Sequence, residues 1–417
     1  MLDNIPRYNM QKPPRRQMLR GLIWLLSAPV LAAHRNRIKK INMEGIEPPY
    51  LLLCNHNAFM DFMVASHAVW PHRANFVVAI DGFIGREWLL RMIGCICTRK
   101  FVSDVTLVRN LKTVIKNGDI AAIYPEARYS LCGTTAVLPA SLGKLAKLLG
   151  VPVVTLMCHG HHVNSPFYHL PDHGVKGTRA ELECILTRDE VADLPHREIT
   201  DRIRRAFVYD DFAWQRDNHV RISYKDRACG LHKVLYQCPA CGTEYRMTSG
   251  GAQLRCEACG KVWELNEYGV LSALEGETEF SHVPDWYEWE RANVRREVRE
   301  GRYRFESDVR VDALPNAKGY IDLGSARLVH DHDGFLLWGK YEGEEYEVKI
   351  PVPEIYSCHI EYEYLGKYGD CIDLNRTDGT YYIYPRGIPF AVTKIALATE
   401  ELYDYWTERQ LESRPNT

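Results

Sequence analysis

The sequence predicts an α/β domain followed by a cysteine-rich insert and a small antiparallel β unit. From about residue 49 to 187, short apolar runs alternate with stretches of helical spacing, which indicates strands and helices in turn. From about 318 to 386, apolar residues recur with period two between turn signals, which indicates antiparallel strands. Between these regions, from about 229 to 270, cysteines occur in closely spaced pairs. The chain therefore divides into three regions with different sequence patterns.

The α/β region contains runs typical of strands, separated by stretches typical of helices. The expected strands are 50–55 (YLLLCN), 74–79 (ANFVVA), 94–99 (GCICTR), 120–125 (IAAIYP) and 151–158 (VPVVTLMC). Helical spacing covers 59–70, 86–93, 104–117 and 139–149, and a charged amphipathic stretch at 194–217 closes the domain.

The C-terminal region has alternating segments framed by two helices. The segments are 320–330, 334–341, 345–352, 357–365, 371–377 and 380–386, with expected helices at 286–301 and 389–411. We assign a basic and apolar segment to residues 1–45, the α/β domain to 46–228, a ribbon to 229–270, a helical linker to 271–315 and a β-rich domain with its C-terminal helix to 316–417.

Composition and charge narrow the class of protein. With 417 residues, 46% of them hydrophobic and 25% charged, the chain is long enough for two or three folded domains. A net charge of -2 gives no argument for nucleic-acid binding. Thirteen cysteines without an export signal suit a reducing cytoplasm, where free thiols pack as small hydrophobes.

The first forty residues are basic and surround an apolar stretch at 21–33 that is interrupted by Pro29. This stretch is too short to cross a hydrocarbon core of about 30 Å. We predict a peripheral or monotopic anchor on the cytoplasmic membrane face, with arginines and lysines meeting anionic headgroups. The alternative is an ordinary first helix packed on the core.

His56 follows the first expected strand, and Asp61 comes five residues later. Side chains at the carboxyl ends of strands in α/β proteins gather at one edge, where sites form. If a helix begins near Asn57, Asp61 lies about one turn in and can accept a proton from the imidazole, which leaves the other ring nitrogen as a base. The nucleophile is then a hydroxyl of the substrate, with Cys54 as an alternative.

Two further strand ends carry charged residues. Arg99 and Lys100 follow one strand, and Glu126 and Arg128 follow another. Together with His56 they predict a shared cleft for a polar, phosphorylated substrate, because guanidinium groups bind phosphate well.

The chain resembles the glycerolphosphate and lysophosphatidic acid (1-acylglycerol-3-phosphate) acyltransferase family over residues 49 to about 160. Four blocks occur in the family's order: NHNAFMD, GCICTR, YPEARYS and VPVVTL. The resemblance implies that His56 is the general base and Asp61 its orienter. The acyl donor would be acyl-CoA or acyl carrier protein, and the acceptor lysophosphatidic acid or glycerol 3-phosphate. Arg99 would hold the acceptor phosphate, with Glu126 and Arg128 on the acceptor side.

The third block departs from the family pattern P-E-G-T-R-S. Here Pro125 and Glu126 are followed by Ala127 and Arg128, so the arginine comes one residue early and the flexible glycine is lost. The alternative function is therefore a catalytically inactive, acyltransferase-like adaptor that binds lipid or protein. His159, His161 and His162 follow the fourth block, and we interpret them as pocket lining or loop packing rather than zinc ligands.

The insert has the spacing C-x2-C-x14-C-x2-C, formed by Cys238, Cys241, Cys256 and Cys259. Two such pairs, each followed by glycine, predict a structural zinc ribbon, with iron as the alternative metal. The expected fold is thus an α/β acyltransferase domain, a zinc ribbon and a small antiparallel β-barrel or sandwich capped by a C-terminal helix. The last unit resembles a pleckstrin-homology-like module in element count, which suggests a protein partner or regulation; a stabilising appendage is the alternative.

Overall fold

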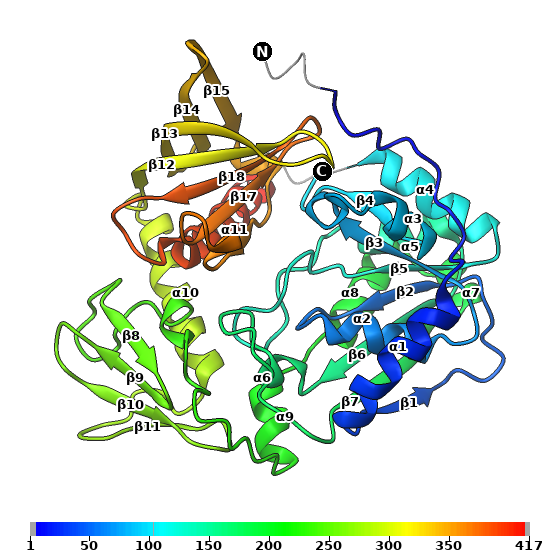
Figure 1. Cartoon of the computed structure of the whole chain (residues 1–417), viewed down its shortest axis with the longest axis horizontal. Coiled ribbons are helices and arrows are strands. Elements are labelled where there is room, and N and C mark those ends of the chain that lie inside the picture. The colour runs from blue at the N-terminus through cyan, green and yellow to red at the C-terminus, as the bar shows by residue number, and fades with distance from the viewer. Residues whose placement is uncertain (1–5, 103, 413–417) are drawn as a thin grey trace.

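The computed structural model describes residues 6–102 and 104–412. The α/β domain forms one side of the molecule, and the cysteine ribbon and the β-rich domain lie on the other (Figure 1). Helix α10 (Val283–Arg299) runs between the ribbon and the β-rich domain. The three units are therefore arranged around a shared centre rather than in a row.

The α/β domain is built on a seven-stranded sheet with the order β1-β7-β6-β2-β5-β3-β4. Neighbouring strands run parallel except β6 and β7, which pair antiparallel. The strands are β1 (Arg37–Ile41), β2 (Leu51–Cys54), β3 (Ala74–Ala79), β4 (Ile96–Thr98), β5 (Ile120–Ile123), β6 (Val153–His159) and β7 (Arg179–Leu186). The five predicted strands are confirmed. The strands β1 and β7 were not predicted, because basic residues separate the two isoleucines of β1 and charged residues alternate with apolar ones in the first half of β7.

Helices cover both faces of this sheet. They are α1 (Arg20–Ala33), α2 (Met60–Ala68), η2 (Ile80–Phe83), α3 (Glu87–Met92), α4 (Val105–Lys116), α5 (Leu142–Leu149), α6 (His161–Asn164), α7 (Arg188–Asp193), α8 (His196–Ala206) and α9 (Asp211–Asp217). Successive strand residues face opposite sides. Leu52 therefore packs with α1 and α2, whereas Leu51 and Leu53 pack with α4, α5 and α8. This three-layer core fixes the sheet edge that carries the site.

Helix α1 packs on α2 and leaves an apolar face exposed. The Trp24 ring lies 5.2 Å from His67 and 5.5 Å from Trp70, between ring centroids. Leu25 and Leu26 on the same helix are exposed. Within residues 6–102 and 104–412, no helix is both long enough and apolar enough to cross a membrane.

The ribbon is a four-stranded antiparallel sheet with the order β11-β10-β9-β8. Its elements are η3 (Leu231–Lys233), β8 (Met247–Gly250), β9 (Gln253–Cys256), β10 (Val262–Leu265) and β11 (Leu271–Ala273). Trp263 in β10 is fully buried against Trp286 in α10, with ring centroids 5.0 Å apart. The ribbon is therefore joined to the rest of the chain through α10.

The C-terminal unit is a seven-stranded antiparallel sheet, β15-β14-β13-β12-β18-β17-β16, packed against a long helix. Its elements are β12 (Phe305–Leu314), β13 (Ile321–Asp331), β14 (Gly334–Tyr341), β15 (Glu344–Ile350), η4 (Val352–Glu354), β16 (His359–Glu361), η5 (Tyr364–Gly366), β17 (Cys371–Asn375), β18 (Thr380–Pro385) and α11 (Ala391–Glu412). An antiparallel sheet capped by a C-terminal helix is as predicted.

One part of the predicted division was wrong. The range 271–315 was assigned to a helical linker, but its end forms β12, the strand that joins the two halves of the sheet through β13 and β18. The buried residues Phe305, Val309 and Val311 alternate with charged ones that pair on the surface, and this charge hid the strand period. The β-rich domain therefore begins before residue 316.

The β-rich domain packs directly on the α/β domain. Ile80, Phe83 and Cys97 share a hydrophobic cluster with Leu314 and Tyr382. A second, larger cluster joins the segment after β5, α6 and α9 to the ribbon, α10 and α11. The strand-end loops of the α/β sheet are thus covered by the C-terminal half of the chain.

Candidate active site

The candidate site lies at the carboxyl edge of the parallel strands β2, β5 and β6. His56 follows β2, Glu126 follows β5 and His161 follows β6. Because β2 pairs with both β5 and β6, these three strand ends are neighbours. Side chains from separate parts of the sequence therefore meet at one edge, as expected for an α/β site.

His56 and Asp61 form the predicted pair. His56 Nδ1 lies 3.3 Å from Asp61 Oδ2, and Asp61 is fully buried in the first turn of α2. The same oxygen accepts the backbone N–H groups of Asn57 at 2.6 Å and Ala58 at 2.9 Å. The side chain of His56 is 22% exposed, and Nε2 has no hydrogen-bond partner among the described residues. This arrangement orients one ring nitrogen and leaves the other open to a substrate.

The charge of Asp61 is well stabilised. Burial alone would raise the pKa of this carboxyl, but hydrogen bonds from His161 and His56 outweigh burial and hold the pKa well below its usual range. Asp61 therefore carries its negative charge at neutral pH.

Two tyrosine rings enclose the His56 imidazole. Tyr124 and Tyr129 each lie 4.2 Å from it between ring centroids. Tyr129 in turn contacts Phe167 at 5.5 Å, and Phe167 lies 5.6 Å from Tyr362 of the β-rich domain. The wall of the site is thus aromatic, and it continues into the C-terminal half of the chain.

Glu126 supports His56 through the backbone. Its Oε2 accepts the N–H of His56 at 2.8 Å, and its Oε1 accepts the N–H of Ala136 at 2.8 Å and the hydroxyl of Tyr209 at 3.1 Å. Burial raises the pKa of Glu126 to about 7, although these donors counteract the rise. Glu126 is fully buried, so the structure gives it a supporting place behind His56.

Cys54 is unsuited to nucleophilic catalysis. Its side chain is fully buried in β2, and burial raises the pKa of the thiol well above its usual value. A protonated, enclosed thiol is a poor nucleophile. The hydroxyl of a substrate remains the better nucleophile for His56.

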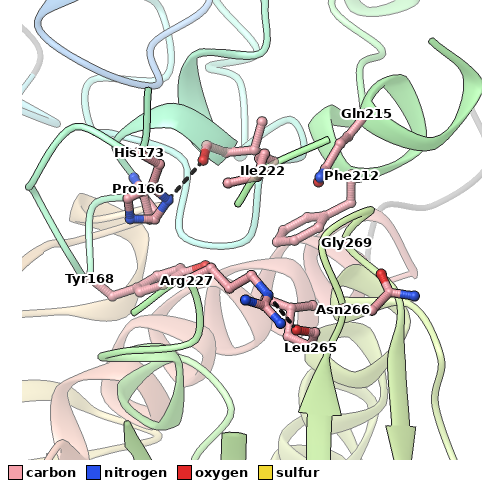
Figure 2. A pocket seen from close by; sticks show the side chains of 11 residues that line it. Pro166, Tyr168, His173, Phe212, Gln215, Ile222, Arg227, Leu265, Asn266 and Gly269 are labelled. Carbon is pink, nitrogen blue, oxygen red and sulfur yellow. Dashed lines mark hydrogen bonds between the residues drawn. The ribbon is translucent and has the colours of Figure 1, made fainter. Parts of the chain in front are cut away.

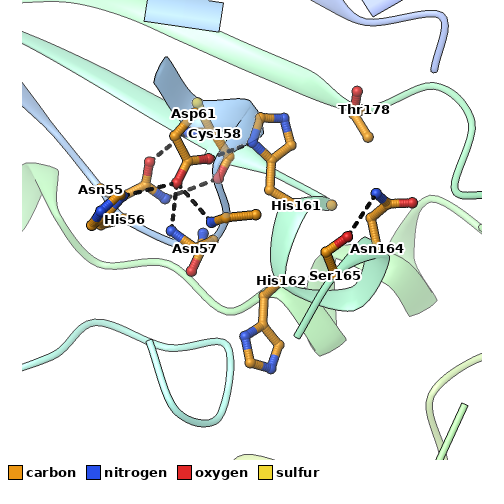
Figure 3. A network of polar contacts seen from close by, with 12 residues as sticks. Asn55, His56, Asn57, Asp61, Cys158, His161, His162, Asn164, Ser165 and Thr178 are labelled. Carbon is orange, nitrogen blue, oxygen red and sulfur yellow. Dashed lines mark hydrogen bonds and ion pairs between the residues drawn. The ribbon is translucent and has the colours of Figure 1, made fainter. Parts of the chain in front are cut away.

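His161 is a second imidazole on Asp61. Its Nδ1 lies 2.5 Å from Asp61 Oδ1, so the two oxygens of one carboxylate face two histidines (Figure 3). His161 is turned toward Asp61, whereas His162 points away from it. From the sequence we interpreted both as pocket lining or loop packing. Nothing in their spacing distinguished the one that reaches Asp61, because a turn at Gly160 decides it.

Asp61, Cys158 and His161 also bring potential metal-ligand atoms within 4.8 Å of one another. Both oxygens of Asp61 already accept hydrogen bonds, and burial raises the pKa of the Cys158 thiol well above its usual value. Hydrogen bonding therefore describes this cluster better than metal ligation.

Arg99 makes its contacts with the β-rich domain. Its Nη1 donates to Leu314 O at 3.1 Å and to Thr380 Oγ1 at 2.7 Å, and its Nη2 donates to Pro315 O at 3.0 Å. Only 6% of the residue is exposed. The neighbouring Lys100 likewise bonds Asp373 of β17 at 3.3 Å. The guanidinium that we predicted to bind phosphate is thus bonded to the β-rich domain in this structure.

Arg128 also faces the C-terminal half of the chain. Its Nη2 lies 2.7 Å from Glu400 Oε1 in α11, and both side chains are buried. Ala127 before it has a positive φ of 53°, the left-handed conformation that a glycine would adopt with less strain. The early arginine therefore extends from the strand end toward α11.

The four ribbon cysteines converge. Cys238 Sγ lies 3.8 Å from Cys259 Sγ, and Cys241 Sγ lies 3.8 Å from Cys256 Sγ. Sulfurs at about 2.3 Å from a tetrahedral zinc are separated by about 3.8 Å, so the donor set and spacing fit zinc. The ligand set was predicted from spacing alone.

A small cavity lies between the α/β domain and the ribbon. Tyr168, His173, Phe212, Arg227 and Leu265 are among its lining residues (Figure 2). Its volume of about 20 Å³ suits a single water molecule. The cavity is a packing gap at this junction and is too small for a substrate.

A partly exposed imidazole bonded to a buried carboxylate at a strand edge defines a general acid–base site. Residues 35–159 match the family model described as Acyltransferase, so this part of the chain is an acyltransferase domain. The match spans less than a third of the 417 residues, and it includes His56, Asp61, Arg99 and Glu126.

A solved structure is also similar to part of the chain. It is the 1-acyl-sn-glycerophosphate (LPA) acyltransferase PlsC from Thermotoga maritima, at 15% sequence identity and a TM-score of 0.37. The similarity covers 45% of this chain and 76% of that one. No curated protein matches the chain.

Proposed function

We propose that the protein is an O-acyltransferase in which His56 acts as the general base. The observation that carries this proposal is the His56–Asp61 pair within an acyltransferase domain, with Nδ1 held by the carboxylate and Nε2 without a partner in the described chain. Nε2 would take the proton of an acceptor hydroxyl as its oxygen attacks the carbonyl carbon of an acyl thioester. The bond from the carbonyl carbon to sulfur then breaks, the leaving thiolate of coenzyme A or acyl carrier protein takes the proton back from His56, and the acyl chain becomes an ester.

For the acceptor, the family resemblance favours lysophosphatidic acid or glycerol 3-phosphate. Arg99 and Arg128, the groups expected to bind phosphate, are bonded to the β-rich domain. An acceptor phosphate at Arg99 would have to replace the carbonyls of Leu314 and Pro315. The acceptor panel should therefore contain a phosphate-free hydroxyl lipid beside the two phosphorylated candidates.

The N-terminal segment supports attachment to a membrane surface. Leu22, Leu25 and Leu26 are exposed on α1, which begins at Arg20, and Arg16 precedes it. Apolar side chains beside basic ones suit an interface with anionic headgroups. We propose that α1 brings the site to the cytoplasmic face of a membrane, where lipid acceptors present their hydroxyls.

The ribbon is proposed to hold one structural zinc through its four cysteines. Four thiolates fill a tetrahedral coordination shell, so no position is left for a substrate. Its place between the α/β domain and α10 suits a role in holding the two halves of the chain together.

The experiment follows label from a radiolabelled acyl thioester into lipid. Purified full-length protein is incubated with labelled acyl-CoA and each acceptor, and His56→Ala is compared with His72→Ala. His72 is a partly exposed histidine beyond the C-terminal end of α2, whereas the site lies at the other end of that helix, and the His72 Nε2 lies 3.6 Å from Glu47 Oε2. We expect label in the product with wild type and His72→Ala, and a loss of at least about a hundredfold with His56→Ala.

The alternative is an inactive adaptor that binds lipid or protein, favoured by the departure at Ala127 and Arg128. Release of free coenzyme A distinguishes the two functions. A chain that binds lipid yet releases no coenzyme A with any acceptor would support the adaptor.

A further inference from the structure

His161 is the residue near the site whose contacts are least explained by packing. It is fully buried, its Nδ1 meets Asp61 Oδ1 at 2.5 Å, and its Nε2 has no partner among the described residues. A carboxylate has no proton to offer, so the imidazole N–H donates. We propose that His161 is a positioning residue for the proposed reaction, one that shares Asp61 with His56 and sets how strongly that carboxylate acts on the base. This inference rests on the proposed function.

The backbone turn before His161 requires a glycine and is held by Asp211. Gly160 has a φ of 84°, and a Cβ there would lie 2.6 Å from the Trp214 ring, so only glycine fits. Asp211 accepts the N–H of Gly160 at 3.0 Å and of His162 at 2.8 Å. The backbone on both sides of His161 is thereby fixed, and its ring is directed at Asp61.

The division of hydrogen bonds on Asp61 has a chemical consequence. Oδ2 accepts two backbone N–H groups and faces His56, whereas Oδ1 accepts from His161. Without the His161 donor, the carboxylate would be less neutralised and could rotate in its site. The more negative carboxylate would favour the imidazolium form of His56, so the base would become neutral only at higher pH.

The surrounding titratable groups are the same in every variant compared. Those facing the two imidazoles come from α2, β6, α9 and the segment after β5, and they are Asp61, Cys158, His159, Asp211, Tyr124, Glu126 and Tyr129. Burial raises the pKa of Asp211 to about 6, against the N–H bonds from Gly160 and His162. Because Asp211 holds the turn on both sides of His161, a substitution in α6 could change its titration. A control substitution at a neighbouring residue of α6 is therefore needed.

Three variants test the proposal. His161→Leu removes the donor, and His161→Asn has nearly the same shape but places an amide N–H where Nδ1 was. His162→Leu is the matched control, because it also replaces a buried histidine of α6 with leucine. The imidazole of His162 has no bond to Asp61, and its ring nitrogens have no partner in the described chain. Circular dichroism and thermal melting establish that each variant is folded.

The pH dependence of kcat/KM is the first readout. For His161→Leu we expect kcat to fall about tenfold or more at neutral pH, with the acceptor KM unchanged. We also expect the acid limb to move to higher pH by about half a unit or more. His161→Asn should recover most of both changes, and His162→Leu should follow wild type. A His161→Leu profile that coincides with wild type, or with that of His162→Leu, overturns the proposal.

Nuclear magnetic resonance of ¹⁵N-histidine-labelled protein is independent of catalysis. The Nδ1 proton between His161 and Asp61 should give a strongly downfield resonance that is lost in His161→Leu and retained in His162→Leu. Titration of the His56 ring should move to higher pH in His161→Leu. Absence of both changes refutes the positioning role even if the protein transfers acyl groups. Their presence supports that role even if no acceptor is found.

Discussion

Arg128 and Glu400 form a buried ion pair between the two halves of the chain. Arg128 Nη2 lies 2.7 Å from Glu400 Oε1, and Arg291 Nη1 lies 2.7 Å from the other oxygen. One buried carboxylate therefore bonds two guanidinium groups, of which Arg291 also lies near Glu288 and Glu401. Burial would raise the pKa of Glu400, but the two arginines hold it below its usual range. This triad joins the strand-end loop of the α/β domain to α10 and α11.

Glu400→Gln should be strongly destabilising. The change removes the charge that pairs with Arg128, whereas Arg291 keeps Glu288 at 3.3 Å and Glu401 at 3.5 Å. Breaking a buried pair in this way costs about 3–5 kcal/mol. Arg128→Met should cost less, because Arg291 still pairs with Glu400. Chemical denaturation gives the free energy of unfolding of both variants and shows which change is the more destabilising.

The matched control is Glu306→Gln. Glu306 also contacts two arginines, Arg304 and Arg327, but on the exposed face of the β-rich domain. Solvent screens such pairs, so the midpoint of unfolding should stay close to that of wild type. If Glu306→Gln and Glu400→Gln lowered the free energy of unfolding equally, burial would not be what makes the Glu400 pairs strong.

Arg99→Met should loosen the contact between the α/β and β-rich domains. The change removes the donors to Leu314 O, Pro315 O and Thr380 Oγ1, bonds that a charged group strengthens. We expect faster hydrogen exchange in β12 and β18, and a smaller effect from Thr380→Val, which removes one acceptor. Unchanged exchange in both strands would contradict the bridging role of Arg99.

Much of the α/β domain could be predicted because its strands are short apolar runs whose signal is local. The His56–Asp61 pair could also be predicted, since both residues lie within one strand end and the following turn. The convergence of Cys238, Cys241, Cys256 and Cys259 could be predicted from their spacing alone. In each case the residues that interact are close in the sequence or carry a repeated pattern.

The partners of Arg99, Arg128 and Asp61 could not be predicted in the same way. Glu400 is far from Arg128 in the sequence, and it lies in an amphipathic helix whose charged residues look solvated. His161 looked no different from His159 and His162 until the Gly160 turn was known. These contacts depend on how distant elements pack, which a single sequence does not encode in any local period.

Removal of metal from the ribbon should destabilise the centre of the molecule. With four thiolates and sulfur separations that fit zinc, we expect one zinc per chain, lost in Cys256→Ser. Loss of the metal should expose Trp263, which packs on Trp286. Addition of a chelator should therefore change the tryptophan fluorescence. Cys229→Ser, outside the cluster, is the control and should keep its metal. A visible absorption band from the purified protein would indicate iron instead.

Glu126 should make stability depend on pH in a defined window. Burial raises its pKa to about 7 in the folded protein, above the usual 4.5 of a glutamate in the unfolded chain, so folding takes up a proton between these values. The stability contribution is complete below pH 4.5 and is lost as pH rises toward 7, where the buried carboxylate must carry a charge. Glu126→Gln removes this titration. Wild type should therefore lose about 2–4 kcal/mol relative to the variant over that window, as measured by urea unfolding at a series of pH values. A constant difference between the two proteins would show that Glu126 is already ionised below this range, with the N–H groups of His56 and Ala136 sufficient to hold its charge.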